Sequence, residues 1–125
     1  MRGSKEDVPA TIELDEAIIQ EAEWGDIHLA FETYNEEFDP TPLFRGLPDD
    51  RCQCPHWGYV LKGRMRVRYA DHEEVVEAGD AYYLVPEHVP FVEAGTEIVE
   101  FSPKDEFQRT MEIVERNFAA MQEGQ

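Results

Sequence analysis

Residues whose side chains bind metal ions occur at strict two-residue spacing in the middle of the chain. Cys52, Cys54 and His56 stand at every second position. Alternate residues of a β-strand point to the same face, so a strand here would line up two thiols and an imidazole. These are ligand types that zinc prefers. The spacing therefore predicts a metal-binding strand, and the alternative is two small core cysteines beside a hydrogen-bonded interior histidine.

The segment that follows predicts a second strand beside these residues. Between residues 64 and 69, arginines at every second position alternate with Met65, Val67 and Tyr69, as in a half-buried strand. Lys62 and Gly63 predict a tight turn, so residues 51–69 are expected to form a β-hairpin. The arginines are expected to pair with the acidic side chains of the next strand, which are Glu73, Glu74 and Glu77.

The rest of the central region also has the pattern of a β-protein. Further strands are expected at residues 27–32, 74–77, 81–85, 91–92 and 96–101, with turns rich in glycine and proline between them. Strands at intervals of about 8–12 residues are typical of all-β sandwiches and barrels. A long irregular connection is expected over residues 36–50, directly before the Cys/His segment. Connections of this length are usually functional.

The two ends of the chain have different patterns. Residues 15–23 allow either a short helix capped by Asp15 or a strand that continues the alternation of Ile12 and Leu14. Ser102 and Pro103 predict the start of a C-terminal helix. Its apolar residues recur at helical spacing, at positions 107, 111, 114, 118 and 121. This stripe is expected either to pack on the outside of the barrel or to contact a second copy of the chain.

Composition limits the classes of partner and the cellular setting. The 125 residues predict one domain. A net charge of −17 and a pI near 4.4 argue against nucleic acids and anionic membranes as partners. No apolar run approaches the ~20 residues that span a bilayer. Same-face neighbours such as the two cysteines lie ~6.6 Å apart along a strand, near the upper limit for a disulfide, which predicts a reducing, cytoplasmic setting.

Two segments resemble the motifs of the cupin superfamily in its small single-domain form. In the first cupin motif, two histidines two residues apart precede a glutamate, and a glycine ends the motif. Gly63 matches this glycine, so that His56 stands at the glutamate position, Cys52 at the second histidine and Asp50 at the first.

The second cupin motif is a Gly-Asp turn, a strand, a Pro-Gly turn and a histidine. The segment from Gly79 to Pro86 matches its outline, but Glu87 stands at the second glycine and Pro90 at the metal-binding histidine. His88 lies two residues before that position. The resemblance covers about residues 26–101 and implies an all-β fold, a small jelly-roll cupin barrel with a C-terminal α-helix. It further implies an N-terminal arm at residues 1–25, a barrel at 26–101, a helix at 102–125, and a homodimer.

The resemblance also implies that the first-motif side chains point into the barrel. The expected metal ligands are Cys52, Cys54, His56 and His88, and the expected ion is divalent, with zinc first. Cupins have no ligand at the position of Cys54, and Asp50 is the alternative to it. Four protein ligands would make a closed structural site, whereas three would leave one position open for water or substrate.

These expectations lead to two hypotheses of function. In the first, the chain is a metal-binding small cupin that binds or transforms a small molecule inside the barrel. In the second, it is a metal-free ligand-binding or regulatory module whose cysteines are core residues or redox-sensitive thiols. His28 and His72 are expected at the surface, and tyrosines and Trp57 are expected in the core, a pocket or a dimer contact. The sequence indicates no phosphate loop, nucleophile elbow or paired-carboxylate site.

Overall fold

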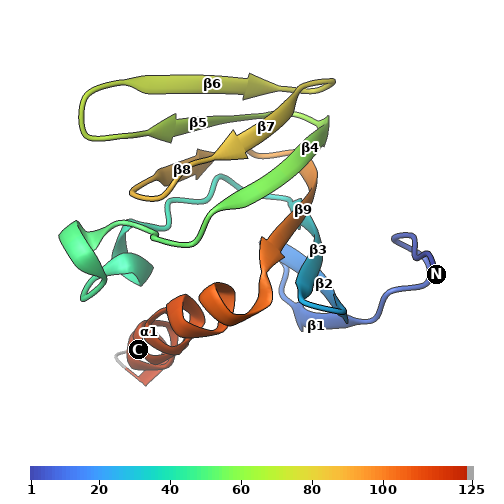
Figure 1. Ribbon diagram of the computed structural model, residues 1–125, viewed down its shortest axis with the longest axis horizontal. Coiled ribbons are helices and arrows are strands. Elements are labelled where there is room, and N and C mark those ends of the chain that lie inside the picture. The colour runs from blue at the N-terminus through green and yellow to red at the C-terminus, as the bar shows by residue number, and fades with distance from the viewer. Residues whose placement is uncertain (124–125) are drawn as a thin grey trace.

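The computed structural model describes residues 1–123 and consists of two antiparallel β-sheets with a long helix at one end (Figure 1). The larger sheet has the strand order β1-β2-β3-β9-β4-β7, and the smaller has the order β6-β5-β8. Buried side chains from both sheets form one core between them. This arrangement confirms the predicted all-β jelly-roll type of fold with a C-terminal helix. The elements are β1 (Ala10–Glu13), β2 (Ala17–Trp24), β3 (Ile27–Tyr34), the 3-10 helices η1 (Thr41–Phe44) and η2 (Pro48–Asp50), β4 (His56–Lys62), β5 (Arg64–Arg68), β6 (Glu73–Glu77), β7 (Ala81–Leu84), β8 (Val89–Val92), β9 (Thr96–Pro103) and α1 (Lys104–Glu123).

The N-terminal region forms strands and not the alternative helix. Strand β2 pairs with β3 along its whole length, from Ala17 opposite Tyr34 to Trp24 opposite Ile27. Gly25, with φ +61°, makes the turn between these strands. The backbone hydrogen bonds of this pairing outweigh the weak helix signal of residues 15–23. The predicted division into an N-terminal arm (1–25), a barrel (26–101) and a C-terminal helix (102–125) is not tested by the positions of these strands and stays a prediction.

The hairpin expected over residues 51–69 does not form, and that prediction is wrong. Strand β4 pairs with β7 and β9, whereas β5 pairs with β6 and β8. The chain crosses from the larger sheet to the smaller one at Gly63, which has φ +81°. A Cβ atom there would lie 2.4 Å from Thr96 Oγ1, so that only glycine fits this crossing.

The alternating pattern of β5 is confirmed. Met65 and Val67 are buried, and the arginines point outward. Two of the predicted ion pairs form, because Arg66 and Arg68 reach Glu73 at 4.0 and 3.8 Å. Arg64 instead pairs with Glu93 at 2.6 Å, since β5 has β8 on its other side and the chain after β8 comes within reach.

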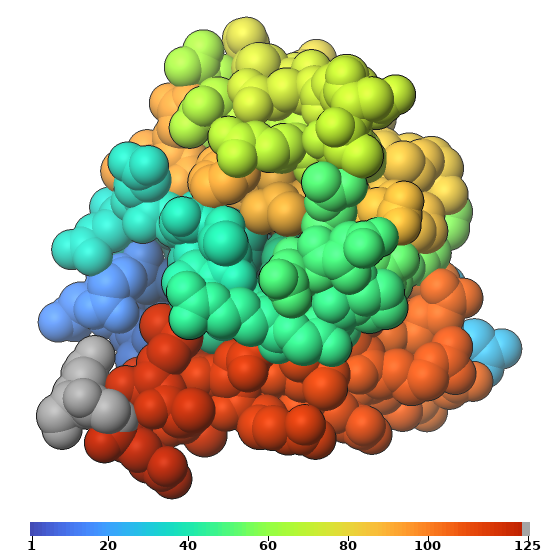
Figure 2. All heavy atoms as spheres, turned by 90° about the vertical axis from the view of Figure 1, so that its left-hand side faces the viewer, coloured from blue at the N-terminus to red at the C-terminus, as the bar shows by residue number. Residues whose placement is uncertain are grey.

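Helix α1 lies across one end of the space between the sheets, against the β3–β4 connection (Figures 1 and 2). Phe107, Met111 and Val114 line an interior cavity. The first half of the predicted stripe therefore packs against the chain's own interior, and not on the outside of the barrel, while Phe118 and Met121 are exposed. No helix among residues 1–123 is both long and apolar enough to cross a membrane.

Candidate metal centre

Backbone hydrogen bonds bring the first and second cupin-like motifs together. The Cys52 N–H donates to the carbonyl oxygen of His88 at 3.0 Å, and the N–H groups of Glu87 and His88 donate to the carbonyl oxygen of Cys52 at 2.8 and 3.3 Å. Glu87 has φ +78° at the tip of its turn. The turn before β8 is therefore hydrogen-bonded to the segment before β4, although the two are far apart in the sequence.

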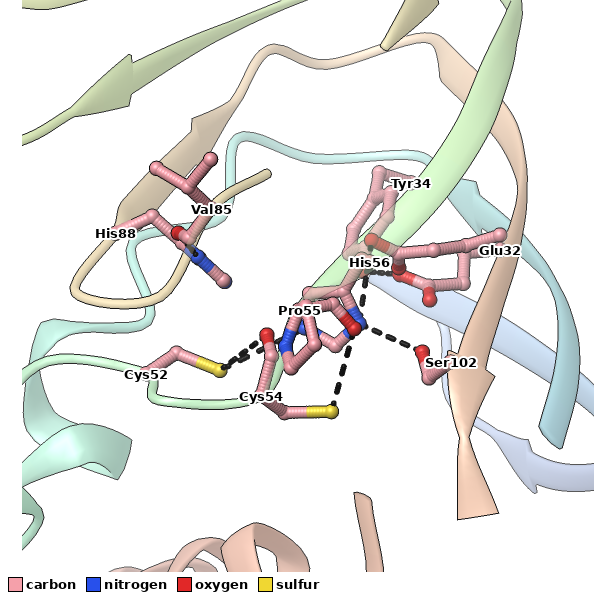
Figure 3. A network of polar contacts seen from close by, with 10 residues as sticks. Glu32, Tyr34, Cys52, Cys54, Pro55, His56, Val85, His88 and Ser102 are labelled. Atoms are coloured by element: carbon pink, nitrogen blue, oxygen red, sulfur yellow. Dashed lines mark hydrogen bonds and ion pairs between the residues drawn. The ribbon is translucent and has the colours of Figure 1, made fainter. Parts of the chain in front are cut away.

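Three of the four predicted ligands meet at this point. One side-chain donor atom each from Cys52, His56 and His88 lies within 4.8 Å of the others. Cys52 Sγ is 3.6 Å from His56 Nε2, and the two imidazole rings lie edge to face with centroids 5.1 Å apart. Figure 3 shows Cys52 and His88 side by side and His56 extending toward them from the start of β4.

Hydrogen bonds hold both imidazole rings so that their Nε2 atoms are available. His88 Nδ1 donates to the carbonyl oxygen of Val85 at 2.6 Å, which leaves the lone pair on Nε2. This Nε2 atom is buried and has no hydrogen-bond partner among the described residues. His56 Nδ1 lies 2.6 Å from Ser102 Oγ and 3.7 Å from a carboxylate oxygen of Glu100. Such partners on the far nitrogen are typical of metal-binding histidines.

The electrostatics of the group fit a bound cation. Burial lowers the pKa of His56 to about 4 and that of His88 to about 3, so both imidazoles are neutral at pH 7. Burial raises the pKa of the Cys52 thiol to about 12. A divalent ion would favour the thiolate over the thiol. Two neutral imidazoles, one of them with its buried Nε2 unpartnered, and one thiol are thus a donor set that suits zinc.

The structure does not bring Cys54 or Asp50 into this group. Cys54 is buried, its Sγ lies 3.4 Å from the Pro55 carbonyl oxygen, and it faces a separate pocket near Thr110. Asp50 is exposed and accepts a hydrogen bond from the Gly46 N–H at 3.0 Å. Residues 52–55 bend, and regular strand geometry begins only at His56. The period-two argument therefore does not apply to Cys54.

A pair of carboxyl groups lies beside the group, contrary to the expectation of no such pair. Glu32 on β3 and Glu100 on β9 are diagonal neighbours on the inner face of the larger sheet, because Glu32 is opposite Ile98 and Ala30 is opposite Glu100. Burial raises the pKa of Glu32 to about 8 and that of Glu100 to about 7. The two groups therefore retain protons near neutral pH.

Sequence reasoning missed three residues of this region. Glu32 and Glu100 could not be identified from the sequence, because acidic residues are frequent in this chain. The two carboxyl groups become neighbours only through the register of two distant strands. Ser102 was expected to cap the helix, but it lies in β9 with its hydroxyl group on His56. Alternation along β9 was the available signal, since Thr96, Ile98, Glu100 and Ser102 all point inward.

The two remaining histidines have different environments. His72 is half-exposed beside Asp71, as predicted. The surface position predicted for His28 is wrong, because this residue is 5% exposed and its ring stacks on Phe107 at 3.7 Å. His28 Nε2 also lies 2.6 Å from Glu21 Oε2. Helix α1 covers the face that appeared polar in the sequence.

The metal-ligand group and the carboxyl pair border one interior cavity of about 170 Å³. Its other walls are mainly apolar and come from β3, the β3–β4 connection, β7, β8 and α1. They include Phe38, Leu43, Phe44, Leu84, Phe107, Met111 and Val114. The arrangement can hold a small molecule next to a bound cation and two carboxyl groups.

Comparison with known proteins identifies the fold. No protein-family model and no curated protein matches the sequence. Among solved structures, an RmlC-like cupin from Shewanella frigidimarina has 15% identity and a TM-score of 0.57, covering 81% of this chain and 88% of that one. The polyketide cyclase RemF from Streptomyces resistomycificus has 19% identity and a TM-score of 0.59, with coverages of 83% and 79%. The iron(II) form of HppE has 10% identity and a TM-score of 0.51, covering 82% of this chain and 59% of that one. The chain therefore has the fold of the cupin superfamily, as the two motifs predicted.

Proposed function

We propose that the protein is a metal-binding small cupin that binds or transforms a small molecule inside its barrel. The observation that carries the proposal is the convergence of Cys52 Sγ and the two histidine rings around the unpartnered Nε2 of His88. Nothing else within the described chain satisfies this buried nitrogen, and leaving such an atom without a partner is costly. The iron(II) form of HppE, a protein of the same fold, adds support for a divalent ion.

Zinc is the ion that we propose for this site. A thiolate and two imidazoles are a common zinc ligand set, whereas oxygen ligands would favour magnesium or manganese. Three protein ligands leave a fourth position for water or a ligand, as in catalytic zinc sites. Bound at Cys52, His56 and His88, the ion would supply a Lewis acid beside the cavity. Ser102 and Glu100 would then fix the orientation of the His56 ring.

Metal content tests this proposal. We expect about one zinc ion per chain, measured by plasma mass spectrometry on protein purified without chelator. The variants His56→Ala and His88→Ala should lose the bound metal, because each removes one of three ligands. His72→Ala is the matched control, since His72 is exposed and lies outside the group. Full metal content in His56→Ala, or no metal in the wild type after incubation with zinc, would contradict the proposal.

The metal-free alternative has one observation in its favour. Both cysteines are buried, and burial raises the pKa of each thiol to about 12, as for core residues. Thiol labelling separates the two hypotheses. If a metal is bound, the Cys52 thiolate should react slowly until a chelator is added, whereas in the metal-free module the chelator should leave the labelling rate unchanged.

Two further features belong to the proposal. We propose a homodimer that forms through the outer face of the larger sheet, where Trp57, Tyr59, Tyr83 and Phe101 are exposed. We also propose a cytoplasmic protein that binds neither nucleic acids nor membranes. Two free thiols fit a reducing compartment, and the charge of −17 opposes binding to polyanions.

A further inference from the structure

The carboxyl pair is the strongest polar feature of the cavity apart from the three proposed metal ligands. Glu32 and Glu100 both border the cavity. Glu32 accepts a hydrogen bond from the Tyr34 hydroxyl group, and Glu100 lies 3.7 Å from His56 Nδ1. Neither carboxyl group forms an ion pair with a lysine or an arginine, and no cationic side chain is found among the described residues that line the cavity.

A buried tyrosine hydroxyl group lies beside the same pair, and its interaction with Glu100 lowers the pKa of that carboxyl group, which burial raises. Tyr82 is 9% exposed, and its buried hydroxyl group has no hydrogen bond of good geometry within residues 1–123. Gly58 stands opposite both Tyr82 and Glu100 in the sheet. A Cβ atom at Gly58 would lie 2.4 Å from the Tyr82 hydroxyl oxygen. The tyrosine side chain therefore crosses over Gly58 toward the Glu100 carboxyl group.

The polar and apolar parts of the cavity together define a ligand class. Two carboxyl groups without a lysine or arginine beside them favour a ligand that carries several N–H donors and a positive charge, because such a ligand would stabilise their ionised form. An anionic ligand would oppose that ionisation and would meet no compensating cation. The aromatic and aliphatic walls favour an apolar body of small size, since the cavity volume is only about 170 Å³.

We propose that the Glu32–Glu100 pair recognises the ammonium group of a small apolar amine bound in this cavity. The inference rests on the proposed function, in which the cavity binds a small molecule, and it names the class of that molecule. The ammonium group would bind to the carboxyl pair through charge-assisted hydrogen bonds. The apolar part would lie against Phe38, Phe107 and Met111.

Three probes of matched size test the inference. Benzylamine, benzyl alcohol and benzoate carry a positive, a neutral and a negative group on the same ring, and their affinities for the full chain are measured at pH 7 by calorimetry and ligand-observed NMR. We expect benzylamine to bind at least about tenfold more tightly than benzyl alcohol, and benzoate to bind least. Equal affinities, tighter binding of benzoate, or no binding of benzylamine would overturn the inference.

Variants then locate the amine within the cavity. Glu32→Gln keeps the shape of the side chain but cannot release a proton to become a carboxylate when the ammonium group binds, and should abolish the preference for benzylamine over benzyl alcohol. Glu97→Gln is the matched control, because Glu97 lies on the outer face of strand β9 and pairs with Lys62. If Glu32→Gln does not fold, the affinities of the three probes for the wild type still show whether the cavity prefers an amine.

A variant without the metal ligand separates this inference from the proposed function. Cys52→Ser should lose the metal but keep the carboxyl pair, so it should retain the preference for benzylamine. This result would also exclude coordination of the amine to a metal as the source of the preference. Metal in the wild type without any amine preference would contradict only the amine subsite. A preference for the amine in protein that never binds metal would contradict only the metal site.

Discussion

At the scale of single residues, the two cysteines differ in role despite their close spacing. Cys52 Sγ lies 3.6 Å from His56 Nε2, whereas Cys54 Sγ contacts the Pro55 carbonyl oxygen and faces another pocket. We therefore expect Cys52→Ser to lose most of the bound metal and Cys54→Ser to retain it. Plasma mass spectrometry of both variants, purified in parallel, measures the difference. Equal loss of metal in the two variants would show that Cys54 is a ligand.

The carboxyl pair predicts a specific dependence of stability on pH. In the folded, metal-free protein the pKa of Glu32 rises from 4.5 to about 8, so the folded state binds a proton that the unfolded chain releases above pH 4.5. Its contribution to stability is complete below pH 4.5 and is lost as the pH rises to about 8. Each proton taken up on folding changes the free energy of unfolding by up to about 1.4 kcal/mol per pH unit.

Denaturant unfolding between pH 6.5 and 8.5, in the presence of a chelator, measures this effect. The free energy of unfolding of the wild type should fall with rising pH, and that of Glu32→Gln should fall less. Burial lowers the pKa of His56 and His88 from 6.5, so these groups act with the opposite sign, but their effect fades as the pH rises above 6.5, the lower end of this range. Glu97→Gln is the control and should keep the wild-type slope, because ion pairing lowers the pKa of Glu97. Identical slopes in wild type and Glu32→Gln would show that Glu32 is ionised in the folded state.

At the scale of elements, the crossing between the sheets depends on one glycine. Gly63 has φ +81°, and a Cβ atom there would lie 2.6 Å from the backbone of Thr96. Gly79 has φ +94° and nothing within 4 Å of a Cβ atom placed there. A substitution at Gly79 is therefore a control that measures backbone strain without overpacking. We expect Gly79→Ala to cost about 1 kcal/mol of stability and Gly63→Ala about 2–4 kcal/mol, because overpacking adds to the strain. Equal losses in urea unfolding would show that the contact with Thr96 relaxes without cost.

The elements also show what local sequence can and cannot specify. The outward arginines of β5 were predictable because one strand with two unlike faces carries its own pattern. The crossing between sheets at Gly63 was not predictable, because a tight hairpin turn and a crossing both use a glycine with positive φ. The partner strands that distinguish them lie elsewhere in the chain.

The candidate site was predictable to the same limited extent. The structure brings Cys52, His56 and His88 together because the two motifs fix their places in the fold, whereas a bend interrupts the strand period at Cys54 and turns its side chain away from them. The burial of His28 depends on a helix that follows much later in the chain. The Glu32–Glu100 pair depends on the β3–β9 register. Contacts of this kind are properties of the assembled sheet and have no local signature.

At the scale of the whole molecule, one uncharged face stands out on a strongly acidic protein. On the outer side of the larger sheet, Phe101, Trp57 and Tyr83 lie in one cross-strand row, and Val99, Tyr59 and Ala81 form the next. No residue of these two rows is charged, and the Trp57 and Tyr83 rings are stacked at 4.9 Å. Two chains that each carry a charge of −17 repel one another. A homodimer that formed through this face would meet the least repulsion and bury the most apolar surface.

The homodimer proposed for this protein can therefore be tested at Trp57, which is 46% exposed at the centre of the face. The wild type should sediment with the mass of two 14.5 kDa chains. Trp57→Glu should sediment as a monomer at the same concentration, because two buried carboxylates would face each other across the twofold axis. Val75→Glu adds the same charge at a residue that is 48% exposed on the other sheet, and it should stay dimeric. Metal content should be unchanged in both variants, because the Trp57 side chain lies on the opposite face of β4 from His56 and Val75 lies on the other sheet. A monomeric wild type would contradict the dimer itself, whereas a dimeric Trp57→Glu would place the contact on another face.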